Sequence, residues 1–194
     1  AIDEKSPYTG GHCQRVPELT MMLAEAADAT TEGPLADFKL TDKDRYELRI
    51  AALLHDCGKV TTPVHVVDKA TKLQTLFDRI HLIDTRFEVM RRDAEVRKWR
   101  SIADGLAMEV ADATYRDFCQ QLEADRAALR RANIGCERMA EADIEQVRQI
   151  AARYRWIAPD GQEQSFLSAD EVENLSIRSG TLTAAERDII NHHI

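Results

Sequence analysis

A histidine and an aspartate stand side by side in the string from Leu53 to Lys59, at the end of a predicted helix. A neutral imidazole beside a carboxylate offers adjacent nitrogen and oxygen ligands, and a carboxylate can bridge two metal ions. Lys59 follows His55 by four residues and Asp56 by three, so a continued helical turn places all three on one face. A cation beside a metal pair is suited to holding and cleaving a phosphodiester. The alternative is an ordinary surface His-Asp pair at a helix end.

His12 is a second candidate ligand, because it stands at a predicted helix start directly after Gly10-Gly11. A lone histidine in that place is more often a capping or surface residue. It becomes a candidate because the pair formed by His55 and Asp56 needs further ligands from elsewhere in the chain.

The elements that must position these residues are predicted to be helices. The first has an apolar face at three- and four-residue spacing, and Pro17 is expected in its first turn. A loop from Thr30 to Lys39 ends it, and Thr41 then caps the helix that runs into His55. The apolar face of the first helix comprises Val16, Leu19, Met22, Leu23 and Ala26.

From Leu73 to Ile157 the sequence is long, charged and periodic. Two apolar seams predict two long amphipathic helices, joined by a turn at 133–136. The plain interpretation is a helical hairpin packed on itself or on the domain, and the alternative is dimerisation or signal relay through its exposed side. The seams are Ala111, Tyr115, Phe118, Leu122 and Leu129, and Ala140, Ile144, Val147, Ala151 and Tyr154.

The last part of the chain is predicted to hold short helices. A turn at 159–161 precedes a helix capped by Ser168, and Thr183 with Glu186 forms a capping box for a terminal helix. No run of alternating residues predicts a strand, so the expected fold class is all-α.

Composition excludes several kinds of protein. With 44% hydrophobic and 31% charged residues, the 194-residue chain is typical of a globular domain. It has 26 Lys and Arg against 34 Asp and Glu, a net charge of -8 that argues against binding DNA or RNA polymers. No apolar stretch approaches the roughly 20 residues that span a bilayer. Four cysteines without a CxxC pair favour a reduced, cytoplasmic setting.

Three strings in order resemble the HD-GYP branch of the HD-domain metal-dependent phosphohydrolases. They run from Tyr8 to Val16, from Ala51 to Lys59, and from Gly180 to Arg187 with 191–194 after it. The resemblance implies an HD-type helical bundle with a long inserted helical hairpin. Its expected parts are a first core segment at 1–72, a helical insertion at 73–158 and a return to the core at 159–194.

The resemblance also implies two or three divalent ions, iron or manganese, and hydrolysis of cyclic di-GMP in bacterial signalling. His12, His55 and Asp56 would be metal ligands, with Asp56 as the bridge, and Lys59 would contact the substrate phosphate. A further ligand is expected at His193, after the Leu-Thr-x-x-Glu helix start. His81 competes for that role if no insertion is present.

The family's His-His-Glu, its Gly-Tyr-Pro and its final metal-binding Asp do not occur in the chain. We therefore expect a piece of a longer protein, inactive alone, with a sensor or receiver domain before it and a possible homodimer through the insertion. One alternative is another HD-domain hydrolase that acts on mononucleotides. The other is a non-catalytic regulatory domain that binds a nucleotide or a partner.

Overall fold

A computed structural model describes residues 11–192 of the chain. It is mostly helical, with one small two-stranded sheet, which confirms the predicted all-α class. The chain divides into two compact units, which are described separately: unit 1 comprises 1–68 and 184–194, and unit 2 comprises 69–183. In the described part, no helix combines the length and the hydropathy that crossing a membrane requires.

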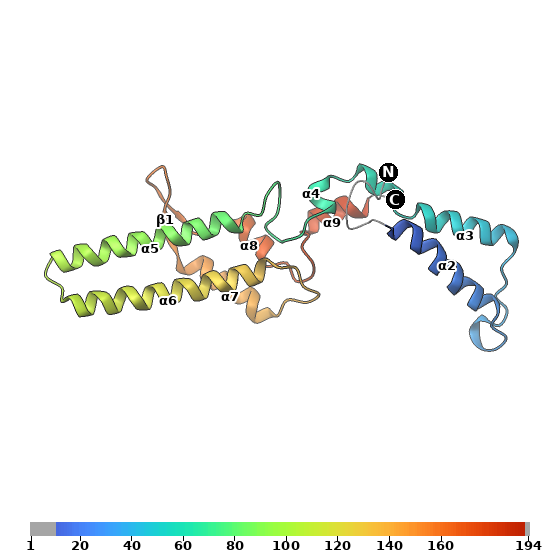
Figure 1. Cartoon of the computed structure of the whole chain (residues 1–194), viewed down its shortest axis with the longest axis horizontal. Helices are drawn as coiled ribbons and strands as arrows, with labels where there is room; N and C mark the ends of the chain where they lie inside the picture. Colours follow the sequence, from blue (N-terminus) through green and yellow to red (C-terminus); the bar gives the residue numbers. More distant parts are fainter. Residues whose placement is uncertain (1–10, 193–194) are drawn as a thin grey trace. The chain divides into compact units, whose positions relative to one another are not determined.

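Unit 1 is built on two helices that pack along each other, α2 and α3 (Figure 1). The Asp28 carboxylate fastens the end of α2 to the start of α3, because it accepts from the Leu40 amide at 2.8 Å and from Arg45 at 2.9 Å. Thr41 caps α3, as predicted, and Asp44 makes this cap a capping box. The helical segments of this unit are α2 (His12–Asp28), the 3-10 turn η1 (Gly33–Leu35), α3 (Asp42–Leu54), the 3-10 turn η2 (Cys57–Thr61), α4 (Val64–Val67) and α9 (Ala184–Asn191).

Two expectations for the first helix are wrong. Pro17 lies inside α2, beyond its first turn, because Gly11 takes a left-handed conformation (φ 75°) and the helix already begins at His12. The predicted apolar face is also largely uncovered: Leu19, Met22 and Leu23 are 57%, 66% and 74% exposed. Within residues 11–192, α3 is the main element that packs on α2, and it covers a different stripe of that helix.

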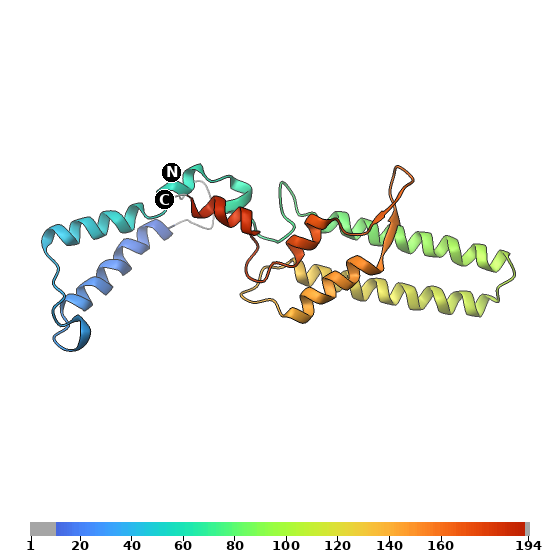
Figure 2. The ribbon, with the colours of Figure 1, turned by 180° about the vertical axis from the view of Figure 1, so that it is seen from behind.

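Unit 2 has a long antiparallel pair of helices, α5 and α6, which lie side by side in Figures 1 and 2. The turn between them falls at 104–107, where Gly105 has a φ of 98°. The longest hairpin is therefore α5–α6, whereas the sequence placed the hairpin turn at 133–136, between α6 and α7. The elements of this unit are α5 (Ile80–Ala103), α6 (Met108–Asn133), α7 (Glu141–Arg153), β1 (Arg155–Ile157), β2 (Glu163–Ser165) and α8 (Ala169–Leu175).

A small β-hairpin follows α7, and the sequence analysis missed it. Trp156 pairs with Gln164 at the centre of the antiparallel register. The turn was predicted: Gly161 has a φ of 79°, and the Asp160 carboxylate accepts from the Gln162 amide at 3.0 Å. Strands of three residues are too short to produce a visible alternation, so only their turn gave a signal.

The core of unit 2 is aromatic at its centre. Phe87 and Phe166 have ring centroids 4.5 Å apart, and Tyr154 packs against both. The buried Tyr154 hydroxyl donates to the Asp125 carboxylate at 2.6 Å. The aliphatic side chains that surround these rings include Leu73, Ile83, Leu129, Ile144, Ile150 and Leu175.

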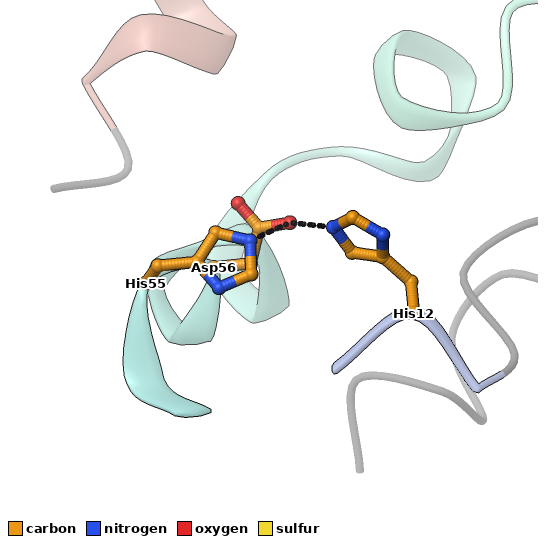
Figure 3. A group of neighbouring side chains, drawn as sticks. All are labelled: His12, His55 and Asp56. Atoms are coloured by element: carbon orange, nitrogen blue, oxygen red, sulfur yellow. Dashed lines mark ion pairs between the residues drawn. The ribbon is translucent and has the colours of Figure 1, made fainter. Parts of the chain in front are cut away.

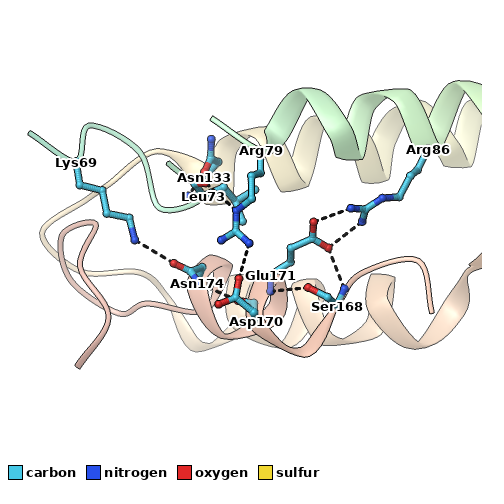
Figure 4. A network of polar contacts seen from close by, with 9 residues as sticks. All are labelled: Lys69, Leu73, Arg79, Arg86, Asn133, Ser168, Asp170, Glu171 and Asn174. Atoms are coloured by element: carbon cyan, nitrogen blue, oxygen red, sulfur yellow. Dashed lines mark hydrogen bonds and ion pairs between the residues drawn. The ribbon is translucent and has the colours of Figure 1, made fainter. Parts of the chain in front are cut away.

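Polar contacts fasten α8 to the start of α5 (Figure 4). Arg86 makes a two-pronged pair with Glu171, through bonds of 2.8 and 2.7 Å. Ser168 caps α8 as predicted, and Glu171 extends this cap to a capping box. Arg79 pairs with Asp170 at 2.5 Å at the same helix. These contacts hold α8 against the end of the α5–α6 pair at which α5 begins, opposite the turn at 104–107.

The chain enters and leaves unit 2 at one place. The Thr181 hydroxyl donates to the backbone carbonyl of Lys69 at 2.8 Å, and the Gly180 amide donates to the Cys136 carbonyl at 2.8 Å. Lys69 in turn donates through its ammonium to Asn174 at 3.0 Å (Figure 4). The first and last residues of the unit are therefore bonded to each other and to its interior.

Candidate metal centre

The His-Asp pair lies where α3 ends. The helix stops at Leu54, His55 is its C-cap, and Asp56 leaves the helical conformation (φ -107°, ψ 8°) before the 3-10 turn η2 begins. This change of backbone direction turns the Asp56 side chain inward, so that it is 8% exposed, while His55 stays 34% exposed. A buried carboxylate is thus paired with an imidazole that solvent can reach.

His12 reaches the same point from the start of α2 (Figure 3). Its Nε2 lies 3.8 Å from Asp56 Oδ2, and His55 Nε2 lies 3.2 Å from the same oxygen. The two imidazole rings meet edge to face, with centroids 5.3 Å apart. One ligand atom from each residue lies within 4.8 Å of the other two. Side chains that are 44 positions apart in the sequence therefore converge on one small volume.

Lys59 completes this cluster. Its ammonium donates to Asp56 Oδ2 at 2.7 Å, through the three-residue spacing seen in the sequence. Burial alone would raise the pKa of Asp56, but the hydrogen bond and charge of Lys59, together with both histidines, outweigh burial and lower that pKa below its usual value. Asp56 is consequently ionised at neutral pH.

The orientation of His55 fits a metal. Its Nδ1 lies 2.8 Å from the Ala52 carbonyl oxygen. Since a carbonyl only accepts, Nδ1 carries a proton, and in the neutral ring the lone pair is then on Nε2, which faces Asp56. A lone pair opposite a carboxylate oxygen is repulsive unless a cation lies between them or the ring is doubly protonated. In metal-binding histidines, a hydrogen bond from the ring nitrogen that does not bind the metal fixes the tautomer in this way.

The donor set is also chemically suitable. Two imidazole nitrogens and a carboxylate oxygen, without thiolate, suit Fe, Mn or another borderline divalent ion. Within residues 11–192, the group of His12, His55 and Asp56 is the cluster of ligand-type side chains close enough to hold a metal ion. These residues fit the predicted cofactor.

Two predicted ligands remain, His193 and His81. His193 lies outside the described residues. His81 is an exposed residue of α5 in unit 2 and is not part of the cluster. Its predicted alternative, a helix-surface histidine, agrees with this exposure. The sequence analysis did not predict the contact between His55 and the Ala52 carbonyl, although its three-residue spacing on a helix was visible.

Comparison with known protein families matches residues 9–117 to the HD domain, a stretch of more than half of the chain. The chain belongs to the HD-domain family. The matched part contains the whole cluster of His12, His55, Asp56 and Lys59. It also extends through α5 into α6, beyond residue 72, so the division into a core and an insertion stays a prediction.

A curated relative resembles part of this chain. Over 72 residues the chain is 40% identical to 3'3'-cGAMP-specific phosphodiesterase 3 of Vibrio cholerae serotype O1. This alignment covers 37% of the present chain and 13% of that protein, so the chain spans only a small part of its relative. No solved structure matches the chain.

Proposed function

We propose that this HD domain belongs to a metal-dependent phosphodiesterase that hydrolyses a cyclic dinucleotide. The first candidate substrate is cyclic di-GMP. The observation that carries the proposal is the convergence of two imidazoles and one ionised carboxylate beside a lysine. The partial relative, which is named for 3'3'-cGAMP, supports a cyclic dinucleotide as the substrate class. Because the chain covers little of that relative, the substrate belongs to the proposal.

In this proposal His12, His55 and Asp56 hold the first metal ion, iron or manganese, and His193 is a further ligand. Divalent ions in such a site polarise a phosphoryl oxygen and lower the pKa of water, so that hydroxide is available near neutral pH. Asp56 supplies negative charge from a buried position, which strengthens its interaction with cations. His55 is held in one tautomer by the Ala52 carbonyl.

Lys59 has a second role in this proposal. Its ammonium donates to Asp56, and the Lys59 side chain as a whole is 26% exposed, so the lysine is only partly buried. A lysine at the edge of a metal site provides a mobile point charge for a phosphate oxygen. We propose that Lys59 binds the substrate phosphate, the role that the sequence also predicts.

The test uses the protein as its natural gene encodes it, purified after expression with added Mn²⁺ or handled without oxygen with Fe²⁺. Bound metal is counted by elemental analysis, and hydrolysis of cyclic di-GMP and 3'3'-cGAMP is followed by chromatography. Asp56→Ala should lose both metal and turnover. Asp37→Ala removes an exposed carboxylate of the same unit and should keep both.

The outcomes separate the alternatives. Turnover of nucleoside triphosphates with neither cyclic dinucleotide cleaved would make the protein another HD-domain hydrolase. Cyclic dinucleotide binding without turnover, in metal-loaded protein, would make it a regulatory domain. Turnover that survives Asp56→Ala would refute the assignment of the site.

A further inference from the structure

A cavity of about 390 Å³ lies in unit 2, far in sequence from the His-Asp cluster. The end of α6, the loop at 134–140 and the start of α7 surround it, and Lys72 reaches it from the segment before α5. Its walls combine apolar side chains of α6 and α7 with five charged or amide side chains. This volume is in the range of small-molecule sites in proteins, roughly 300–1,000 Å³.

Lys72 is the unusual residue of this cavity, because it is fully buried (0% exposed) and makes no ion pair with a carboxylate among residues 11–192. Its ammonium contacts the Met139 sulfur at 3.0 Å and the Leu175 carbonyl oxygen at 3.3 Å. An ammonium has three N–H donors, and a thioether is a weak acceptor. Burial lowers the pKa of Lys72, and the nearby Cys136 and Asp143 oppose this shift. A buried cation without an anion in direct contact is costly, so the position of Lys72 requires an explanation.

Two arginines that line the same cavity also lack a polar partner among the described residues. The side chains of Arg131 and Arg138 make no hydrogen bond or ion pair within residues 11–192. Two other arginines of unit 2 differ from them: Arg86 pairs with Glu171, and Arg130 pairs with a buried aspartate of α5. Two exposed arginine side chains without a partner among the described residues thus line the cavity that Lys72 reaches.

The start of α7 contributes a carboxylate and an amide side chain to the cavity wall. Asp143 and Gln146 line the cavity, and in the described residues neither side chain has a hydrogen bond or an ion pair. A carboxylate and an amide can accept from and donate to the edge of a nucleobase. The apolar walls, to which Ala132 and Val147 contribute, suit the face of a flat ring.

We propose that this cavity is a binding site for a purine nucleoside monophosphate. Lys72, Arg131 and Arg138 bind the phosphate, and Asp143 and Gln146 bind the base edge. The base lies against the apolar wall formed by α6 and α7. A dianionic phosphate supplies the counter-charge that the buried ammonium lacks. The proposal does not depend on the metal site or on phosphodiesterase activity.

The test is calorimetric titration of the 194-residue chain with GMP, AMP, guanosine and inorganic phosphate. The chain carries Asp56→Ala and the buffer contains EDTA, so that the first site does not contribute. We expect GMP or AMP to bind and guanosine not to bind, because the phosphate makes the charged contacts. The double variant Arg131→Gln/Arg138→Gln should weaken binding by about tenfold or more. Arg148→Gln, at an exposed arginine of α7 outside the cavity, is the matched control and should not change it.

Lys72→Met separates a ligand-binding lysine from a structural one. Methionine is similar in shape and removes a buried charge, so the variant should lose nucleotide binding while its thermal unfolding midpoint stays equal or rises. If the midpoint falls and binding persists, Lys72 is structural and the proposal is wrong. Absence of GMP and AMP binding at millimolar concentration, or equal binding by the arginine double variant, also overturns it.

Discussion

Replacing Lys59 with methionine tests how charge is balanced at the candidate metal centre. The Lys59 ammonium donates at 2.7 Å to the same Asp56 oxygen that faces both histidines at 3.2 and 3.8 Å. A divalent ion bound by His12, His55 and Asp56 must displace this ammonium or share the oxygen with it. Since both are cations, the lysine and the metal compete, and removal of the lysine should favour the metal.

The size of the effect follows from the contact. A hydrogen bond to a charged group contributes roughly 1.5–3 kcal/mol. Because Lys59 is 26% exposed, water replaces part of this interaction, and we take the lower end, about 1.5 kcal/mol. That free energy corresponds to about a tenfold change in an equilibrium constant. We expect Lys59→Met to bind Mn²⁺ about tenfold more tightly, and to hydrolyse substrate more slowly because the phosphate contact is lost.

The assay is competition for Mn²⁺ between the EDTA-stripped protein and a fluorescent chelator at pH 7. Lys43→Met is the control, since it makes the same charge change on α3 at a lysine that is 80% exposed and pairs with Glu47. Its affinity for Mn²⁺ should equal that of the natural protein. If Lys59→Met binds Mn²⁺ equally or less tightly, the lysine supports the site instead of competing for it, and this reasoning is refuted.

Three further predictions concern unit 2. Glu171→Gln should destabilise the protein by about 3 kcal/mol in urea unfolding at pH 7, because it removes the buried negative charge that pairs with Arg86. The pKa of Glu171 is lowered, so this stabilisation is present above the ordinary value of 4.5 and is lost as the pH falls below it; at low pH the variant and the natural protein should converge. Burial, together with its hydrogen bond to a carboxylate, raises the pKa of Tyr154 to about 12, so an ultraviolet titration should show a late tyrosine that is lost in Tyr154→Phe, with stability falling between pH 10 and about 12. Gly135→Ala places a Cβ 2.6 Å from the Thr181 methyl and should cost about 1–3 kcal/mol; Thr181→Ser keeps the hydroxyl, removes that methyl and should restore most of the loss in a double-mutant cycle.

Local features of the fold could be predicted from the sequence because they depend on neighbouring residues. The caps at Thr41 and Ser168 require only a hydroxyl and an acidic residue three positions later, and both are present in the structure. The approach of Lys59 to Asp56 follows from a spacing of three on a helical turn. The meeting of His12 with His55 depends on how α2 packs against α3, and it was suggested only through a family resemblance.

Features that depend on long-range packing were not predicted. Lys72 is separated by 67 residues from Met139, the sulfur of which it contacts, and nothing near it in the sequence shows that it is buried. The bond between Tyr154 and Asp125 spans 29 residues and joins the residue after α7 to α6. A charged side chain is normally expected at the surface, so buried charges are found from the structure alone.

The bond between the Thr181 hydroxyl and the Lys69 carbonyl has an evolutionary consequence. The two ends of unit 2 lie together, near Lys69 and Thr181. Helices α5 and α6 can therefore gain or lose whole turns without changing the distance between these two ends. Domain insertions are tolerated at places where both ends lie together. Relatives with a longer, shorter or absent helical pair are therefore expected to keep the spacing from His12 to Lys59 intact, and engineers can exchange residues 69–183 as a cassette.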